Sequence, residues 1–287
     1  MFEKTPGFGA WERPLGLDRL SAEDRARVVF TQGAERNGPS IHWLGHSSFL
    51  IVWEGQRILL DPVFARWIGP VRRACPLPEK RISELRPTAI LVSHAHLDHL
   101  DWRSLQRFDG VPIYLPGGSG SFLPKLLRAR AQELAPGEEI QLGDLRFEGV
   151  VALHGGWRYP WQLGRQAFGY LLSNSGDSLY FGGDSAYGGY FKKIGAERKI
   201  DWALLPIGAY APRWFLKTRH MNPEEAILAF ADLGAKRMIP YHFGGYRLSL
   251  EPLWEPLPRF ARAAREKGVD WCLPIAGDLR EDGLPSA

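Results

Sequence analysis

The sequence has few cysteines and no long apolar segment. Its 287 residues include two cysteines, Cys75 and Cys272, which lie far apart and form no C-x-x-C motif. We therefore expect two reduced thiols in a reducing compartment, with a single disulfide as the alternative. No run of about eighteen apolar residues occurs, and the amino terminus lacks the apolar core of a signal peptide. These absences predict a cytoplasmic protein, which could touch the inner membrane surface peripherally without crossing it.

The chain also lacks a strong excess of charge of either sign. Lys and Arg number 36 against 32 Asp and Glu, a formal charge of +4, and the basic residues are spread along the sequence. This balance permits an anionic substrate but gives no indication of a nucleic-acid partner. No internal repeat or low-complexity tract divides the chain. We expect an amino-terminal extension over residues 1–40, packed on a single domain over residues 41–287.

Four potential metal ligands are concentrated between His94 and His99. The sequence there is H-A-H-L-D-H, and it follows the apolar run at residues 89–92. Neutral imidazole and carboxylate are common ligands of zinc and related ions, and side chains at i and i+2 can reach one ion from a turning backbone. The pattern predicts a metal site, and the close succession of Asp98 and His99 favours a second ion. A histidine-rich surface loop is the alternative.

Short strand-like runs elsewhere in the chain also end in residues that bind metals. These runs cover residues 57–60, 89–93, 147–153, 179–183 and 237–241, and the residues that follow them are Asp61, His94, His154, Asp184 and His242. Strands that end at one edge of a sheet bring residues distant in sequence to one place. Taken singly, each residue has an ordinary interpretation as a core histidine or a turn aspartate. Together they predict one shared site.

Helices are predicted at four places. Asn222-Pro223-Glu224-Glu225 has the composition of a helix start, and Gly234 that of a helix end. A second helix is expected over residues 258–267, closed by Gly268. Shorter candidates cover residues 21–30 and 123–133. Residues 71–79 and 155–165 are expected to be loops.

The ordered metal motifs resemble those of the metallo-β-lactamase fold hydrolases. Further segments are similar to the N-acylphosphatidylethanolamine-hydrolysing phospholipase D subgroup of that family. They are W-L-G-H at 43–46, L-D-P-V-F at 60–64, I-S-E-L at 82–85 and L-P-I-G-A-Y-A-P-R-W-F at 205–215, continuing through Lys217, His220 and residues 222–225. The metal motifs are specific for the fold and its metal centre. The further segments indicate the subgroup, but they indicate its substrate less specifically.

The resemblance implies an α/β fold, the four-layer αβ/βα sandwich, with two divalent ions. Zinc is the default ion, and iron and manganese are the alternatives. Asp61 would orient the ligands through hydrogen bonds. The ligands implied are His94, His96 and His154 for the first ion and Asp98, His99 and His242 for the second, with Asp184 bridging the two. Such an ion pair lowers the pKa of a water molecule towards neutrality and stabilises negative charge on the substrate.

The resemblance further implies that His220 is catalytic, together with the metal ligand Asp98. His220 precedes a predicted helix start, where an anion is favoured; a structural turn histidine is the alternative. Trp157 and Trp214 could line an acyl-chain pocket or dip into a bilayer interface, or they could pack the loops. Candidates for binding a phosphate oxygen are Arg158, Arg213 and Lys217, although each could also be ordinary surface charge.

Three functions follow. The first is a phosphodiesterase of phospholipase D type that acts on N-acylphosphatidylethanolamine-like substrates. The second is a lactone or carboxylic ester hydrolase with a soluble substrate, which could be phosphorylated. The third is a metal-binding protein without turnover. Leu97 stands where the animal phospholipases have tyrosine, and Gly155-Gly156 are inserted after His154, so hydrolysis is better supported than the lipid substrate. A homodimer would fit the family.

Overall fold

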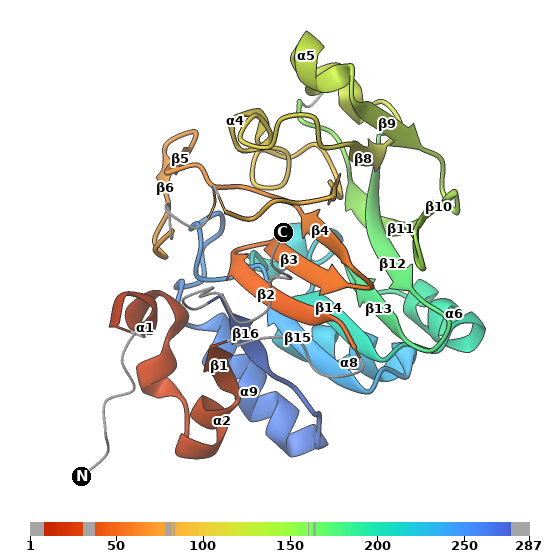
Figure 1. Cartoon of the computed structure of the whole chain (residues 1–287). Coiled ribbons are helices and arrows are strands. Elements are labelled where there is room, and N and C mark those ends of the chain that lie inside the picture. The colour runs from red at the N-terminus through yellow and green to blue at the C-terminus, as the bar shows by residue number, and fades with distance from the viewer. Residues whose placement is uncertain are drawn as a thin grey trace.

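Two β-sheets packed face to face form the centre of the molecule (Figure 1). The computed structural model describes residues 9–30, 38–77, 82, 84–159, 161–162 and 165–276. Phe49 of the first sheet meets two aromatic rings of the second, with ring centroids 6.2 Å from Phe181 and 5.5 Å from Tyr241. These rings are fully buried, so the contact between the sheets is a continuous apolar core.

Within the described ranges, the first sheet has eight strands. Its order is β1 (Val28–Phe30), β16 (Leu273–Ile275), β2 (Ser40–Gly45), β3 (Ser48–Trp53), β4 (Gln56–Leu60), β7 (Ala89–Leu91), β8 (Ile113–Pro116) and β9 (Ala131–Leu134). Alternate side chains point to opposite faces: Ile58 and Leu60 belong to the core between the sheets, whereas Leu59 belongs to a second core on the outer face. Leu105 of α4 (Trp102–Leu105) and Leu127 of α5 (Lys125–Arg128) lie in that outer core.

The second sheet has six strands in the part of the chain that the structure describes. Its order is β10 (Glu139–Leu142), β11 (Leu145–Gly155), β12 (Gln166–Ser173), β13 (Ser178–Phe181), β14 (Trp202–Pro206) and β15 (Arg237–Tyr241). Helix α8 (Pro223–Leu233) packs on β14 and on its neighbours α6 (Tyr190–Glu197) and α9 (Pro256–Lys267). The molecule is therefore an αβ/βα sandwich, as predicted, with helices outside both sheets.

The remaining elements are short. A two-stranded ribbon joins β5 (Trp67–Ile68) to β6 (Val71–Arg72), and α7 (Arg213–Leu216) precedes α8. The 3-10 turns cover Leu17–Arg19 and Ser119–Phe122. The amino-terminal helices are α1 (Gly9–Leu15) and α2 (Ala22–Ala26), and Arg265 of α9 pairs with Asp24 of α2. Figure 1 shows α2 beside α9. No helix in the described ranges has the length and apolar composition needed to cross a bilayer.

Helix α8 confirms the strongest helix prediction. The Asn222 side chain accepts from the Glu225 N–H at 2.9 Å, and the Glu225 carboxylate accepts from the Asn222 N–H at 3.2 Å. This reciprocal pair is a capping box, which satisfies backbone donors that the first helical turn leaves unpaired. Gly234 ends the helix in the left-handed conformation. Helix α9 is also confirmed, although it begins two residues earlier than expected, at Pro256.

Three local predictions were wrong. The helix expected over residues 21–30 stops at Ala26, because Val28–Phe30 forms strand β1 alongside β16. The helix expected over 123–133 is one turn long, because Ala131–Leu134 pairs with β8 as edge strand β9. The loop expected over 71–79 contains the strand β6, while residues 78 and 79 lie outside the described ranges. For the first two segments, pairing with a strand distant in sequence outweighs the local pattern, whereas β6 pairs with the nearby strand β5 in a local hairpin. Cys75 and Cys272 form no disulfide within the described chain, as predicted.

Asp201 ties together the starts of two neighbouring strands, and its charge should contribute to stability. Its carboxylate accepts from the Ser178 N–H at 3.0 Å, and the Lys236 ammonium lies 2.7 Å away. Burial alone would raise the pKa of this carboxyl, but the bonds from Lys236 and Ser178 outweigh burial and lower it. We expect Asp201→Asn to reduce the free energy of unfolding by about 1 kcal/mol at neutral pH.

The pH dependence tests this assignment. A depressed native pKa contributes stability above the unfolded value of about 3.9, and that stability is lost as the pH falls through the native pKa. Urea unfolding of the Asp201→Asn variant should therefore differ from that of the wild type at neutral pH, and the difference should shrink at acidic pH. Asp144→Asn, at an exposed turn, is the control and should have no effect. An equal deficit at every pH would contradict the ionic contribution.

Candidate metal centre

The seven predicted ligands meet at one edge of the two sheets. The loop after β7 carries four of them, β11 carries one near its end, and one each follows β13 and β15. They are His94, His96, Asp98, His99, His154, Asp184 and His242, and their ligand atoms fall into overlapping groups within 4.8 Å. The convergence follows from the topology, because these strands end at the same edge.

Three imidazoles form the first half of the centre. His96 Nδ1 lies 2.9 Å from His94 Nε2 and 3.1 Å from His154 Nε2. A zinc ion with three nitrogen ligands at about 2.0–2.1 Å holds them about 3.3 Å apart in tetrahedral geometry. The observed spacings are close to that value. We call these three residues the first half-site.

Two imidazoles and a carboxylate form the second half of the centre. His99 Nε2 and His242 Nε2 are 3.3 Å apart, and they lie 3.5 Å and 3.4 Å from the Asp98 Oδ2 atom. Nitrogen and oxygen donors in such a group suit zinc, iron or manganese alike. We call these three residues the second half-site.

Asp184 lies between the two half-sites. Its Oδ2 atom is 3.2 Å from both His99 Nε2 and His242 Nε2, and 4.0 Å from His154 Nε2. The other oxygen, Oδ1, is buried without a hydrogen-bond partner among the described residues. Because an unpaired buried carboxylate oxygen is costly, the donor set fits a cation at this point.

Hydrogen bonds behind the ligands orient their rings. Asp61 is fully buried, and its carboxylate accepts from His99 Nδ1 and from the Ser93 hydroxyl, both at 2.6 Å. His154 Nδ1 donates to the Arg219 carbonyl at 2.9 Å, which leaves Nε2 of that ring unprotonated and turned towards the centre. Such outer contacts select the tautomer that can bind a metal.

The electrostatics of the two half-sites differ. Burial and the neighbouring imidazoles lower the pKa of His94 well below its ordinary value and that of His96 to about 4. Burial would also lower the pKa values of His99 and His242, but the negative charge of Asp184 and the other carboxylates outweighs the effect of burial. They hold the pKa of His99 well above the ordinary value and raise that of His242 to about 9. The first half-site therefore offers neutral lone pairs, whereas the second attracts positive charge.

The backbone at the centre is unusual. His46, Asp61 and His242 follow β2, β4 and β15, and all three have left-handed φ angles of 54°, 40° and 64°. Residues with side chains rarely adopt this conformation, and it clusters at functional sites. Gly208 allows the carbonyl of His242 to approach, because a Cβ atom there would lie 2.0 Å from that oxygen.

Two more histidines lie at the centre. His220, predicted to be catalytic, places its Nδ1 atom 3.7 Å from Asp184 Oδ2, and its side chain is 12% exposed. His46 was not assigned a role from the sequence, yet its Nε2 atom lies 3.2 Å from Asp98 Oδ2. A signal was present, because His46 follows the strand-like run 40–45 just as several predicted ligands follow theirs.

The two arginines predicted to bind substrate have partners within the protein. Arg158 donates to the carbonyls of Ala95 and Leu100, at 2.7 Å and 2.6 Å, and so braces the loop that carries the ligands. Arg213 forms a two-pronged ion pair with Glu225, at 2.7 Å and 2.8 Å, and donates to the His220 carbonyl at 3.0 Å. Their donors therefore hold the ligand loop and the His220 segment in place.

The other predicted substrate residues lie around the centre. The Trp157 ring packs edge-on against the His96 ring, with centroids 5.7 Å apart. Trp214 is 86% exposed on α7, and Lys217 is exposed just after that helix. Trp157 therefore touches a predicted ligand directly, whereas Trp214 and Lys217 lie on the surface of the segment that leads to His220.

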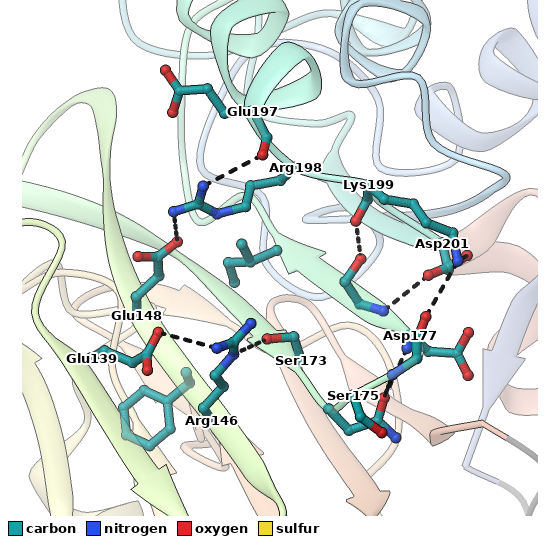
Figure 2. A pocket seen from close by; sticks show the side chains of 15 residues that line it. Glu139, Arg146, Glu148, Ser173, Ser175, Asp177, Glu197, Arg198, Lys199 and Asp201 are labelled. Atoms are coloured by element: carbon teal, nitrogen blue, oxygen red, sulfur yellow. Dashed lines mark hydrogen bonds and ion pairs between the residues drawn. The ribbon is translucent and has the colours of Figure 1, made fainter.

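A cavity of about 330 Å³ lies at the opposite end of β13 (Figure 2). Its basic side chains are paired within the cavity: Arg198 lies 3.4 Å from Glu148, and Arg146 lies 4.0 Å from Glu139. The cavity shares no residue with the metal centre. It is therefore not the substrate cleft of that centre.

Comparison with known proteins identifies the family to which the chain belongs. The model described as "Beta-lactamase superfamily domain" matches residues 56–243. An uncharacterised protein of Mycobacterium tuberculosis is 32% identical over 252 residues, which cover 83% of this chain and 67% of that protein. The mitochondrial N-acyl-phosphatidylethanolamine-hydrolyzing phospholipase D of Saccharomyces cerevisiae is 31% identical over 246 residues, covering 79% of this chain and 52% of the yeast protein.

Solved structures show the same fold. The isothiocyanate hydrolase from Delia radicum gut bacteria superposes with a TM-score of 0.68 at 18% identity, covering 83% of this chain and 97% of that structure. Likeness at this identity supports the architecture alone. The family model, by contrast, spans more than half of the chain and contains the seven converging residues. The chain therefore belongs to the metallo-β-lactamase superfamily and is one of its metal-dependent hydrolases.

Proposed function

We propose that this hydrolase is a phosphodiesterase of phospholipase D type that binds two divalent metal ions at the metal centre. Zinc is the ion we propose first, with iron and manganese as the alternatives. The substrate would be an N-acylphosphatidylethanolamine-like phosphodiester. Water would cleave the bond between phosphorus and the alcohol oxygen, which leaves a phosphatidic-acid-type product and an alcohol such as an N-acylethanolamine. The observation that carries the proposal is the position of His220, 3.7 Å from the carboxylate between the half-sites and partly open to solvent.

The ions, when bound, would lower the pKa of a water molecule and polarise the phosphoryl group. The protein's own residues supply the rest. Asp61 and the Arg219 carbonyl hold the ligand rings in orientation. Burial lowers the pKa of His220 well below its ordinary value, so the imidazole is neutral. Its Nδ1 has no hydrogen-bond partner among the described residues, so this ring can form a hydrogen bond with a substrate oxygen. Arg213 fixes the backbone of His220 through its carbonyl.

An exposed apolar surface next to His220 supports a lipid substrate. Trp214 is 86% and Phe215 50% exposed on α7, and Leu250, whose N–H donates to the Ala211 carbonyl, is 69% exposed. Arg219 lies over the Phe215 ring, 4.6 Å from its centroid. Aromatic side chains mixed with cations favour the interface of a membrane that carries negative charge. We infer that this surface makes the peripheral membrane contact.

Substrate assays separate the proposal from its alternatives. The purified protein, reconstituted with zinc, manganese or iron, should hydrolyse bis-p-nitrophenyl phosphate and an N-acylated phospholipid in vesicles. Product analysis should detect phosphatidic acid and the free alcohol. Turnover of lactones without turnover of either phosphodiester would reject the proposal in favour of an ester hydrolase. Absence of all turnover in a metal-loaded protein would favour a binding role.

Loss of a predicted ligand should remove metal and activity together. Asp98→Asn replaces the carboxylate of the second half-site by a neutral amide, so we expect metal content to fall and turnover to drop at least ~100-fold. Elemental analysis and phosphodiester assays measure the two effects, and circular dichroism should show the fold retained. Leu97→Ala, at an exposed side chain in the same loop, should keep the metal content of the wild type. Full metal occupancy in Asp98→Asn would contradict the assignment.

Replacement of His220 should separate chemistry from metal binding. His220→Ala removes a group that would contact the substrate, so we expect turnover to fall about 10²–10⁴-fold. Metal content should remain at the level of the wild type, and Thr218→Ala, two residues earlier on the exposed surface, serves as the control for both measurements. Loss of the ions in His220→Ala would show instead that His220 is itself a ligand.

A further inference from the structure

His46 is a buried histidine at the centre that the metal motifs do not include. It follows strand β2 with a φ angle of 54° and is 1% exposed. Its ring lies 4.4 Å from the His242 ring and 6.0 Å from the His99 ring, measured between centroids. Burial of an imidazole in a left-handed backbone position is unfavourable unless its surroundings hold it there.

The surroundings of His46 hold it firmly. Its carbonyl accepts from the Trp43 indole N–H at 2.8 Å and from the His242 N–H at 3.2 Å. The Tyr246 ring packs edge-on against the imidazole at 5.2 Å. Gly245 closes the remaining side, because a Cβ atom there would lie 2.6 Å from the His46 Cβ atom. The imidazole therefore has one well-defined orientation.

Tyr246 is itself anchored by a buried arginine. Arg73 donates to the Tyr246 hydroxyl at 3.1 Å, and to the Val63 and Leu44 carbonyls at 2.9 Å and 3.0 Å. The Tyr246 hydroxyl donates in turn to the Ala65 carbonyl. The wall behind His46 is thus a hydrogen-bonded framework that resists movement of the ring.

The two ring nitrogens of His46 have different surroundings. Nε2 faces Asp98 Oδ2 at 3.2 Å, whereas Nδ1 is buried with no hydrogen-bond partner among the described residues. A proton on Nε2 gives a hydrogen bond to the carboxylate, and a proton on Nδ1 would have no acceptor. The hydrogen-bond pattern therefore assigns the proton to Nε2, and that nitrogen then has no lone pair for a metal ion.

We propose that His46 is a positioning residue of the second half-site, whose Nε2–H holds the Asp98 carboxylate in place. The oxygen it contacts, Oδ2, is the same atom that lies 3.5 Å from His99 Nε2 and 3.4 Å from His242 Nε2. The hydrogen bond stops rotation of the carboxylate, so that Oδ2 stays beside both imidazoles. This inference rests on the two-ion centre proposed above.

Metal affinity tests the proposal directly. Zinc binding to the whole 287-residue chain is measured by competition with a chromophoric chelator, for the wild type, His46→Leu and His46→Gln. His46→Leu removes the donor at similar size, and we expect one ion, that of the second half-site, to lose affinity about 10–100-fold while the other ion is unaffected. In His46→Gln the side-chain amide can place an N–H near the former Nε2, so most of the affinity should return.

The matched control is His42→Leu, on the strand β2 that leads to His46. His42 is also buried, and it lies four residues and about 13 Å before His46 along β2, so both affinities should equal those of the wild type. Three results would overturn the proposal: unchanged affinities in His46→Leu, equal weakening of both ions, or complete loss of one ion at saturating zinc, which would make His46 a ligand. A wild type that binds fewer than two ions would instead refute the two-ion centre.

Discussion

Burial of negative charge at the meeting point of the strands is the constraint on which the rest of the centre depends. Asp61, Asp98 and Asp184 are almost completely withdrawn from solvent, and carboxylates in that position are strongly unfavourable unless hydrogen bonds or positive charge compensate them. Asp61 obtains its compensation from Ser93 and His99. The negative charge of Asp184 is compensated only in part, because its Oδ1 atom has no hydrogen-bond partner among the described residues. Bound cations would supply the positive charge that these buried carboxylates lack.

The framework around this charge is rigid at several levels. The apolar contact between the two sheets fixes where the strands end, and left-handed backbone at His46, Asp61 and His242 turns these side chains into the centre. Outside the ligands, Arg158 braces the ligand loop, and Arg213 links the capping box of α8 to the backbone of His220. Pre-organisation of this kind reduces the reorganisation that binding and catalysis require.

Two of the local errors of prediction share one cause. Residues 21–30 and 123–133 each contain enough helix-forming side chains to suggest a longer helix, yet Val28–Phe30 and Ala131–Leu134 complete the edges of the first sheet. Hydrogen bonds to a distant strand decide such segments, and a local pattern carries no information about them. Helix α8 was predictable because its proline, its capping box and its final glycine all act locally. The role of Arg213 was not predictable, because Glu225 and the His220 carbonyl become its partners only in the folded chain.

The sequence by itself determined the superfamily, the sandwich architecture and the residues that meet at its edge, because the spacing of H-x-H-x-D-H and the strand endings are local features. Only the tertiary structure decided how these residues are oriented: that one oxygen of Asp184 has no hydrogen-bond partner among the described residues, that Asp61 holds both Ser93 and His99, and that His46 joins the group. The physical reason is that hydrogen-bond direction and desolvation depend on neighbours from remote strands. Those neighbours are defined only once the two sheets have packed together.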